Sequence, residues 1–363
     1  AQGYPCWTPF QGQLRQQAFS HVASGAAMVE YWHWHSIHNS FETYWRGLLS
    51  HDFKENHVYC EAKTIGRDFA ALSPALCNLN KVAMVVSNDA LSALDWFRID
   101  TTAEGPGKTA YNDVVRWMYD ALYKMNVEVD FIEPSCKEMD RYQMVIVPAL
   151  YAACEADLQR MKQYVADGGY LITTFKTAYT DENVKVYHDA FPHVLSECLG
   201  ISYSNFTFPK NVKLSGTADE QAELFMELVK PEGAEVLASY DHYAWKDYAA
   251  VTRNHYGKGT AQYLGCKTSE KYLQKLLADA MKEEGWEFAS HTWGHINLSS
   301  SSLERVQADT KRWLDEVGSL VGPTTILYYP HGARPDGDDV QQTGPIFKYL
   351  QEQGFRVFAS VGI

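Results

Sequence analysis

Between residues 81 and 175, short apolar runs alternate with amphipathic segments of helical period. The expected strands are 81–87, 127–132, 142–150 and 170–175, and the expected helices are 109–125 and 155–167. Strands that alternate with helices form parallel sheets, so this alternation predicts a doubly wound α/β domain of flavodoxin-like type. No GxGxxG or GxxxxGK[ST] sequence follows a strand, and we therefore do not expect a nucleotide site.

The residues before this alternation predict a different element order. A helical segment begins at Gln13 and stops at Gly25, an apolar strand is expected at 27–34, and a second helix should run from His57 to Pro74. A strand, a polar and aromatic loop and a helix in this order are typical of the last unit of a (β/α)8 barrel.

From residue 205 the apolar runs are short and follow one another more closely than in the preceding α/β domain. We expect a small, mainly β domain at 205–282, with a hairpin around "YGKG" and a closing helix from Ser269. From 286 the pattern predicts strands 286–293, 324–332 and 355–361 with helices 302–317 and 343–353. That βαβαβ run is too small to close a barrel, and both faces of its sheet need partners.

Composition limits the function classes. The chain has 363 residues and a formal net charge of −13, which argues against nucleic acid or an anionic membrane surface as partner. No run of 18 apolar residues is present, so we expect no membrane span. The 10 Trp and 23 Tyr mildly favour a carbohydrate enzyme, although large aromatic cores give the same enrichment.

The seven cysteines are scattered and contain no CxxC pair, so we interpret them as reduced thiols in a cytoplasmic protein. The N-terminus, "AQGYPCWTPF", shows no basic region followed by an apolar run, so no signal peptide is visible, and the last residues, "FRVFASVGI", are typical of a strand without a following element. We expect that the native chain is longer at both ends.

The stretch "WTPFQGQLRQQAFSHVASGAAMVEYWHWHSIHNSFETYWRGLLSHD" carries an ordered series of residues: Trp7, Arg15, Gly25-Ala26, Trp34 and Glu42. With the α/β domain that follows, it resembles a glycoside hydrolase family 42 β-galactosidase. The resemblance implies the C-terminal part of a catalytic barrel at 1–80, a trimerisation domain at 81–204 and a small β domain at 205–282. It also implies a homotrimer without a cofactor that hydrolyses terminal β-D-galactosides with retention.

The same resemblance implies sugar contacts for four side chains. Trp7 would form an apolar wall, and Glu42 would accept hydrogen bonds from galactose hydroxyls, which suits an acceptor-only carboxylate. Trp45 stands where the family often has His, and His35 replaces a more usual Arg. An alternative without a role in sugar binding also fits each of the four side chains: an aromatic residue in a loop, or a polar group exposed to solvent. We expect no metal at "YWHWHSIH", since no carboxylate or Cys completes a ligand set.

Retaining glycosidases need two carboxylates about 5 Å apart. The resemblance places the acid/base Glu after barrel strand four and the nucleophilic Glu after strand seven, both before the position of Trp7. Glu30 lies inside the expected strand eight, and we do not assign it a catalytic role. We therefore expect part of the substrate pocket in this chain and neither catalytic carboxylate.

The C-terminal segment carries "SHTWGH" and then "YYPHG" at 328–332. Together they resemble the polysaccharide deacetylases at 284–363, which implies His291 and His295 as ligands of Zn²⁺ or another divalent metal. The third ligand and the catalytic base of that family have no counterpart here, so we expect poor metal affinity. The sequence thus reads as pieces of two families that meet near 282–285.

Three hypotheses stay open at this point. The chain is part of a β-galactosidase, a metal-dependent polysaccharide deacetylase, or a non-catalytic trimeric assembly module.

Overall fold

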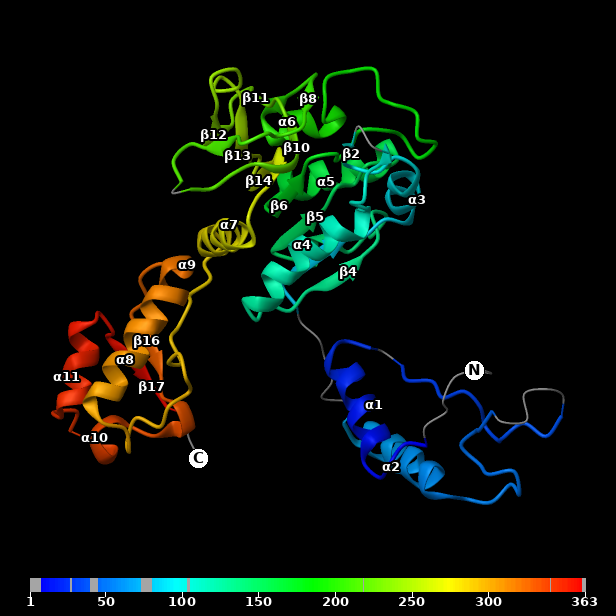
Figure 1. Ribbon diagram of the computed structural model, residues 1–363, viewed down its shortest axis with the longest axis vertical. Helices are drawn as coiled ribbons and strands as arrows, with labels where there is room; N and C mark the ends of the chain where they lie inside the picture. Colours follow the sequence, from blue (N-terminus) through cyan, green and yellow to red (C-terminus); the bar gives the residue numbers. More distant parts are fainter. Residues whose placement is uncertain are drawn as a thin grey trace. The chain divides into compact units, whose positions relative to one another are not determined.

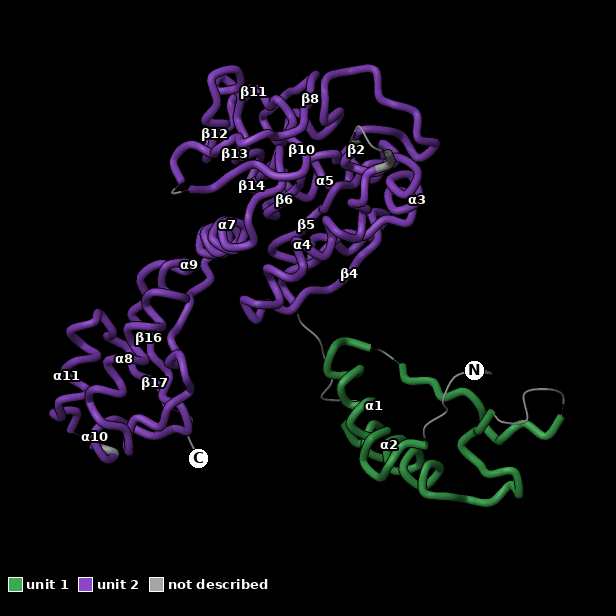
Figure 2. Tube along the Cα trace, viewed as in Figure 1, with its two compact units in different colours: residues 1–79 green, residues 80–363 purple. Residues whose placement is uncertain are grey.

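The computed structural model describes residues 8–26, 28–39, 45–72, 80–102, 105–217, 219–339 and 341–360. The chain divides into two compact units, residues 1–79 and residues 80–363 (Figure 2).

The described part of the first unit contains two helices (Figure 1). They are α1 (Gln13–Ala23) and α2 (His57–Leu72). The ring centroids of Phe19 and Phe69 lie 4.9 Å apart between them, and Arg15 Nε pairs with an Asp68 oxygen at 2.8 Å. Helix α1 ends as the sequence predicts, because Gly25 adopts a φ of 93° that an L side chain rarely tolerates.

The expected buried strand at 27–34 is wrong. The described residues 28–34 form no strand, and the side chain of Trp32 is 73 % exposed. Four backbone hydrogen bonds instead join residues 33–37 to residues 45–49, with N···O distances between 2.8 and 3.1 Å. At Gly47 an added Cβ would lie 2.3 Å from the carbonyl carbon of His35, so this close approach requires glycine. The described part of the unit contains no strand beside which 28–34 could pair.

A sheet of eight strands forms the centre of the second unit. Its order is β4 (Asp130–Ile132), β1 (Val82–Val85), β5 (Met144–Val147), β6 (Tyr170–Thr174), β14 (Gly259–Leu264), β13 (Ala249–Tyr256), β12 (Glu235–Asp241) and β9 (Lys213–Leu214). The pairs from β4 to β14 are parallel, and those from β14 to β9 are antiparallel. The predicted α/β class is therefore confirmed, with a mixed sheet in place of a purely parallel one.

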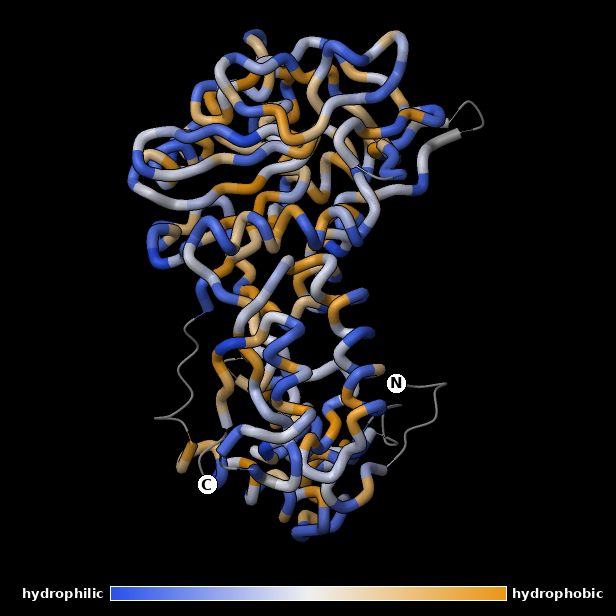
Figure 3. Tube along the Cα trace, turned by 90° about the vertical axis from the view of Figure 1, so that its left-hand side faces the viewer, coloured by the Kyte–Doolittle hydropathy of each residue, from blue (hydrophilic) through white to orange (hydrophobic). Residues whose placement is uncertain are grey.

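Helices flank this sheet, including the two that the alternation predicts at 109–125 and 155–167. They are α3 (Asn88–Trp96), α4 (Tyr111–Lys124), α5 (Glu155–Asp167) and α7 (Glu270–Glu283). Every residue of β1, β5 and β6 is buried, as expected of strands covered on both faces. Figure 3 shows hydrophobic stretches in the interior of this body and hydrophilic ones along its outer loops.

The central sheet includes strands from the range 205–282, which the sequence predicts as a separate small β domain. Strand β14 pairs in parallel with β6, from Thr260 opposite Tyr170 to Leu264 opposite Thr174. Every residue of β14 is buried, including polar ones, so this strand continues the central sheet. The predicted hairpin is confirmed: β13 and β14 pair antiparallel across a turn in which Gly257 has a φ of 61°.

Smaller elements complete the body around residues 196–267. A three-stranded sheet contains β15 (Cys266–Lys267), β10 (Glu223–Glu227) and β8 (Phe206–Thr207). The others are α6 (Ser196–Leu199) and the pair β7 (Ile201–Ser202) and β11 (Lys230–Pro231). Outside this range, between α3 and α4, lies a further short pair, β2 (Thr101–Thr102) with β3 (Gly105–Pro106).

The C-terminal segment has its own apolar core around Trp313, Leu327, Leu350 and Phe355. Its helices are α8 (Leu303–Trp313), α9 (Ser319–Val321), α10 (Pro335–Asp338) and α11 (Pro345–Glu352), and its strands are β16 (Ile326–Tyr328) and β17 (Val357–Ala359). The two strands are parallel. The expected strand at 286–293 is reduced to a single bridge between Ser290 and Leu327.

Within the described ranges, we find no helix that combines the length and the apolarity needed to cross a bilayer.

Candidate functional site

Two of the four predicted sugar contacts, Trp7 and Glu42, lie outside the described residues. The other two, Trp45 and His35, lie in the first unit, and the structure places them in different surroundings.

Trp45 lines a pocket of about 510 Å³ in the first unit. Tyr31 and Trp32 line it as well, and so do residues 56–58 at the beginning of helix α2. Asn56 fixes this helix start, because its Oδ1 accepts hydrogen bonds from the backbone N–H groups of Val58 at 2.9 Å and Tyr59 at 3.1 Å. An aromatic wall beside polar groups is the kind of lining that small-molecule pockets use.

His35 does not line this pocket. Its Nδ1 donates a hydrogen bond to the Ser36 carbonyl at 2.8 Å, and its ring lies 5.1 Å from that of Phe53 and 5.7 Å from that of His38. His38 stacks on Phe53 with the ring centroids 4.6 Å apart. The structure therefore does not bring His35 and Trp45 together at one site.

The predicted metal ligands do come together. The ring centroids of His291 and His295 lie 4.9 Å apart, and the ring of His331 lies 4.5 Å from that of His295. His291 Nδ1 donates to the Tyr328 carbonyl at 3.0 Å, which leaves its Nε2 without a proton in the neutral ring. His331 Nε2 donates to the His295 carbonyl at 3.3 Å.

Helix α8 and the turn after it hold the loop that carries these histidines. Asp309 accepts hydrogen bonds from the backbone N–H groups of Trp293 at 2.9 Å and Gly294 at 2.7 Å. The Trp293 indole donates to Glu316 at 2.8 Å, and the guanidinium carbon of Arg312 lies 3.4 Å from the centroid of the Trp293 rings. Side chains from residues 309–316 thus fix the loop from one side.

His331 was not predicted as a member of this cluster. It follows β16, and the parallel bridge from Ser290 to Leu327 brings the ends of the two segments to the same edge. That shared edge is the signal from which its proximity could have been inferred, since "YYPHG" and "SHTWGH" each follow an expected strand.

The three histidines do not constitute a metal centre as they stand. Among the residues that the structure describes, no group of three or more His, Cys, Asp or Glu side chains is arranged to hold a metal ion. A catalytic zinc site needs three protein ligands and an open position. The donor set seen here therefore does not fit the metal of a deacetylase.

A buried carboxylate in the second unit is a polar feature that sequence reasoning missed. Glu227, at the end of β10, is 1 % exposed, and burial raises the pKa of its carboxyl group. It accepts hydrogen bonds from the Tyr263 hydroxyl at 2.6 Å and from the backbone N–H of Lys176 at 2.9 Å. The Tyr240 hydroxyl donates to the backbone carbonyl of Glu227 at 2.9 Å.

The Lys176 ammonium lies among aromatic rings. Its Nζ is 4.2 Å from the ring centroid of Phe225, 4.8 Å from that of Phe206 and 5.1 Å from that of Tyr179. Burial lowers the pKa of this amine, and cation–π attraction offsets part of the desolvation cost. Because Lys176 follows β6 and Glu227 ends β10, the cluster joins the central sheet to the three-stranded sheet, and we interpret it as structural.

Three family models match the chain. One described as "Beta-galactosidase trimerisation domain" matches residues 80–287, and one described as "Beta-galactosidase" matches residues 7–72. A third, described as "Polysaccharide deacetylase", matches residues 235–355. The first and third overlap at 235–287, so they do not define a junction near 282–285.

Curated relatives are β-galactosidases. BgaB of Geobacillus sp. (strain Y412MC61) is 28% identical over 307 residues, which cover 83% of this chain and 44% of the relative. LacZ of Heyndrickxia coagulans is 29% identical over 280 residues, with 75% and 41% covered. BgaA of Planococcus sp. (strain 'SOS Orange') is 27% identical over 377 residues, and that match covers 98% of this chain and 53% of the relative.

Solved structures give the same result for the fold. The β-galactosidase from Bacillus circulans sp. alkalophilus has a TM-score of 0.62 and 24% identity, with 79% of this chain and 44% of that chain covered. The enzyme from Rahnella sp. R3 has a TM-score of 0.61 and 25% identity, with 80% and 44% covered.

The chain spans about half the length of the curated relatives it matches, or somewhat less. The trimerisation-domain match alone extends over more than half of the chain, and the "Beta-galactosidase" match precedes it in the expected order. The chain therefore belongs to the β-galactosidases of glycoside hydrolase family 42.

Proposed function

We propose that this chain is part of a retaining β-galactosidase that hydrolyses terminal β-D-galactosides. The observation that carries the proposal is the ordered pair of family matches, residues 7–72 followed by residues 80–287. The pocket lined by Trp45 lies within the first of these matches. Its aromatic and polar lining suits a neutral sugar.

In this proposal the chain positions the sugar and does not cleave it. Trp45 provides an apolar wall, and Trp7 and Glu42 add the wall and the acceptor that the family resemblance implies. A retaining mechanism needs an acid/base and a nucleophilic carboxylate about 5 Å apart. We propose that neither belongs to residues 1–363, so that both must come from elsewhere in the complete enzyme.

We further propose that the second unit assembles as a homotrimer. Support comes from the name of the matching domain and from large exposed side chains on α3, α4 and the edge strand β4. Trp96 is 86 % exposed, Tyr123 is 67 % exposed and Phe131 is 53 % exposed. Exposed aromatic groups of this kind mark surfaces that partners cover. Light scattering of the 363-residue chain would test this, with three times 41.2 kDa expected and a monomer as the contradicting result.

We also propose a cytoplasmic location. Five described cysteines are free thiols, namely Cys60, Cys136, Cys154, Cys198 and Cys266, which suits a reducing compartment.

The polysaccharide deacetylase reading is the second candidate, favoured by the match at 235–355 and by the paired rings of His291 and His295. Because the described residues do not complete a metal centre, we derive no catalytic step from it. We propose only that these two histidines bind a divalent cation weakly.

The test of the main proposal uses the protein purified from its source. It should hydrolyse a nitrophenyl β-D-galactoside, and proton NMR of the first-formed galactose should show the β anomer. Trp45→Ala should raise KM by about tenfold, since removing one apolar contact costs on the order of 1–3 kcal/mol of binding. Tyr243→Ala, at an exposed aromatic residue of the other unit, is the matched control and should leave KM unchanged. Absence of hydrolysis by the source protein would overturn the proposal.

A further inference from the structure

The second unit contains a pocket of about 730 Å³ between the central sheet and helix α7. The sheet contributes Tyr170 from β6, Arg253 from β13 and Gln262 from β14, while α7 contributes Tyr272 and Asp279. Apart from Ser319 and Leu320, every lining residue lies between Tyr170 and Glu283. None of these residues has a role in the function proposed above.

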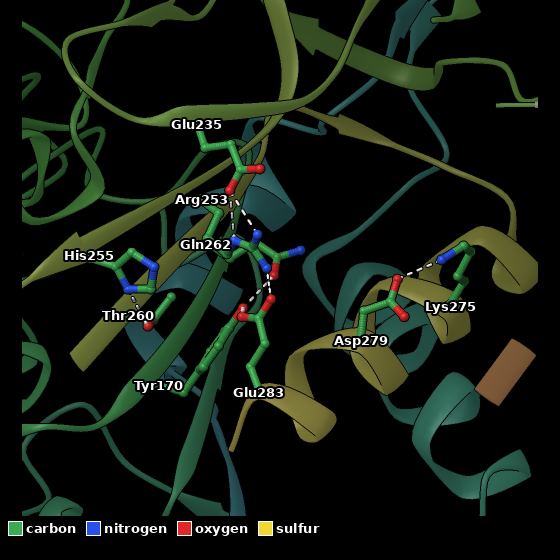
Figure 4. A network of polar contacts seen from close by, with 9 residues as sticks. All are labelled: Tyr170, Glu235, Arg253, His255, Thr260, Gln262, Lys275, Asp279 and Glu283. Atoms are coloured by element: carbon green, nitrogen blue, oxygen red, sulfur yellow. Dashed lines mark hydrogen bonds and ion pairs between the residues drawn. The ribbon is translucent and has the colours of Figure 1, made fainter. Parts of the chain in front are cut away.

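The floor of this pocket holds an incompletely satisfied amide. Gln262 is 2 % exposed, and its Oε1 accepts a hydrogen bond from the Tyr170 hydroxyl at 3.0 Å (Figure 4). Its Nε2 is buried and has no hydrogen-bond partner in the part of the chain that the structure describes. Leaving a buried donor unpaired costs about 1–3 kcal/mol, and native structures satisfy most such groups. A ligand that accepts a hydrogen bond would remove this cost.

The charged groups around the amide compensate one another. Arg253 pairs with Glu235 at 2.7 Å and also contacts Glu283, whose Oε2 lies 3.4 Å from the Tyr170 hydroxyl oxygen. On α7, Lys275 pairs with Asp279 at 2.6 Å (Figure 4). The lining as a whole carries Arg253, Lys271, Lys275 and Lys282 against Glu220, Asp279 and Glu283, so it has no large excess of either sign that would select for an ion. Carboxylate oxygens and N–H donors lie next to each other, as a ligand with several hydroxyl groups requires.

Apolar groups supply the remaining surface. Leu237, Leu276 and the ring of Tyr272 line the same pocket. A pocket with an apolar wall, a few converging polar groups and this volume suits a small molecule.

We propose that this pocket binds a neutral carbohydrate of one or two rings, with a hydroxyl or ring oxygen accepting the hydrogen bond from Gln262 Nε2. The site belongs to the second unit and is separate from the pocket lined by Trp45. It does not depend on catalysis, so an inactive enzyme would still bind the sugar here.

The experiment is isothermal titration calorimetry of the 363-residue chain with lactose, a neutral disaccharide, and in a second arm with inorganic phosphate. All variants carry Trp45→Ala, which removes the wall of the first pocket. Lactose should bind, and Gln262→Met should weaken the binding roughly tenfold through loss of one buried hydrogen bond. The matched control is Gln163→Met, an exposed glutamine of α5 whose amide donates to Asp167 at 3.0 Å, and it should not change the affinity.

Circular dichroism would establish that Gln262→Met folds. Should that variant unfold, Asp279→Ala takes its place, because this side chain is 43 % exposed and its removal should also weaken lactose binding. Lactose binding that is unaffected by the substituted pocket residue, binding of phosphate alone, or no binding at all would each overturn the proposal. A galactosidase assay of the source protein is independent of all three outcomes.

Discussion

The run at 28–34 and strand β5 are both expected as strands from the sequence, and only β5 forms one in the structure. In β5 every residue is buried between two parallel neighbours, β1 and β6. In the first unit, the described residues 28–34 form no strand, and Met28 is 75 % exposed. An apolar run becomes a strand only where other strands satisfy its backbone groups. The described part of the first unit offers no such partner strand, whereas β1 and β6 satisfy both edges of β5 in the second unit.

The largest difference between the two regions is expected when an apolar residue in each is replaced by aspartate and the loss of unfolding free energy is compared. Val145→Asp would place a charge where the wild-type side chain is 0% exposed, so the second unit should lose about 5 kcal/mol or more of unfolding free energy. Met28→Asp is the matched change in the exposed run and should cost less than about 0.5 kcal/mol. Differential scanning calorimetry of both variants measures this. Equal losses of unfolding free energy in the two variants would contradict the difference in burial between the two regions.

Within the second unit, removal of the buried Glu227 side chain should lower the unfolding free energy nearly as much as removal of an apolar core side chain. Glu227→Ala leaves the Tyr263 hydroxyl and the Lys176 N–H without their acceptor, and the expected cost is about 3 kcal/mol. Glu223→Ala, on the same strand, is the control. The Glu223 side chain is 50% exposed and pairs with Lys267 at the surface, so its loss should cost less than about 1 kcal/mol. Similar costs for the two variants in urea unfolding would contradict a structural role for Glu227.

The carboxyl group of Glu227 should also make the unfolding free energy depend on pH. Burial raises the pKa of Glu227 above its ordinary value of 4.5, so the folded state holds this proton more tightly than the unfolded state. Its contribution to stability is complete below the unfolded pKa and is lost as the pH rises through the folded pKa. Glu227→Gln stays neutral, so its stability relative to wild type should improve as the pH rises from 4 toward neutrality. Urea midpoints at several pH values measure this, and a constant difference would be the contrary result.

Zinc binding at the C-terminal histidines should be weak, and its measurable effect should be smaller than those of the substitutions above. The C-terminal segment has a packed core, yet the described part of the chain completes no metal site at its histidines. Zinc titration by calorimetry should therefore show only weak binding, and His291→Ala should change little else. His57→Ala, in the first unit, is the control for nonspecific binding by histidine. Tight stoichiometric zinc binding that is lost in His291→Ala but kept in His57→Ala would contradict this expectation.

Much of the central sheet was predictable because its local and global signals agree. Helix α5 has the predicted bounds, Glu155 to Asp167, with Gly168 at its end. Helix α3 was not predicted, although Ser87 caps it by accepting a hydrogen bond from the Ala90 N–H. Strand β14 was predicted as half of a hairpin, and its parallel pairing with β6 depends on contacts far apart in sequence that periodicity does not encode.

The candidate sites were less predictable. His291 and His295 were found from their spacing, whereas His331 joins them only through the pairing of two distant segments. Trp45 lines a pocket and His35 lies against Phe53 and His38, and the sugar contacts expected of both side chains stay predictions. Gln262 could not be predicted as a pocket residue, because a polar side chain inside a fully buried strand has no distinct sequence pattern.

We propose that this chain holds part of a sugar pocket and an α/β domain, and that the catalytic carboxylates of the enzyme lie outside residues 1–363. Hydrolysis of a nitrophenyl β-D-galactoside by the purified 363-residue chain tests it most directly. We predict no turnover above the buffer blank at protein concentrations at which the source protein gives a clear rate. Turnover by the 363-residue chain, abolished by a Glu→Gln substitution within it, would contradict the account.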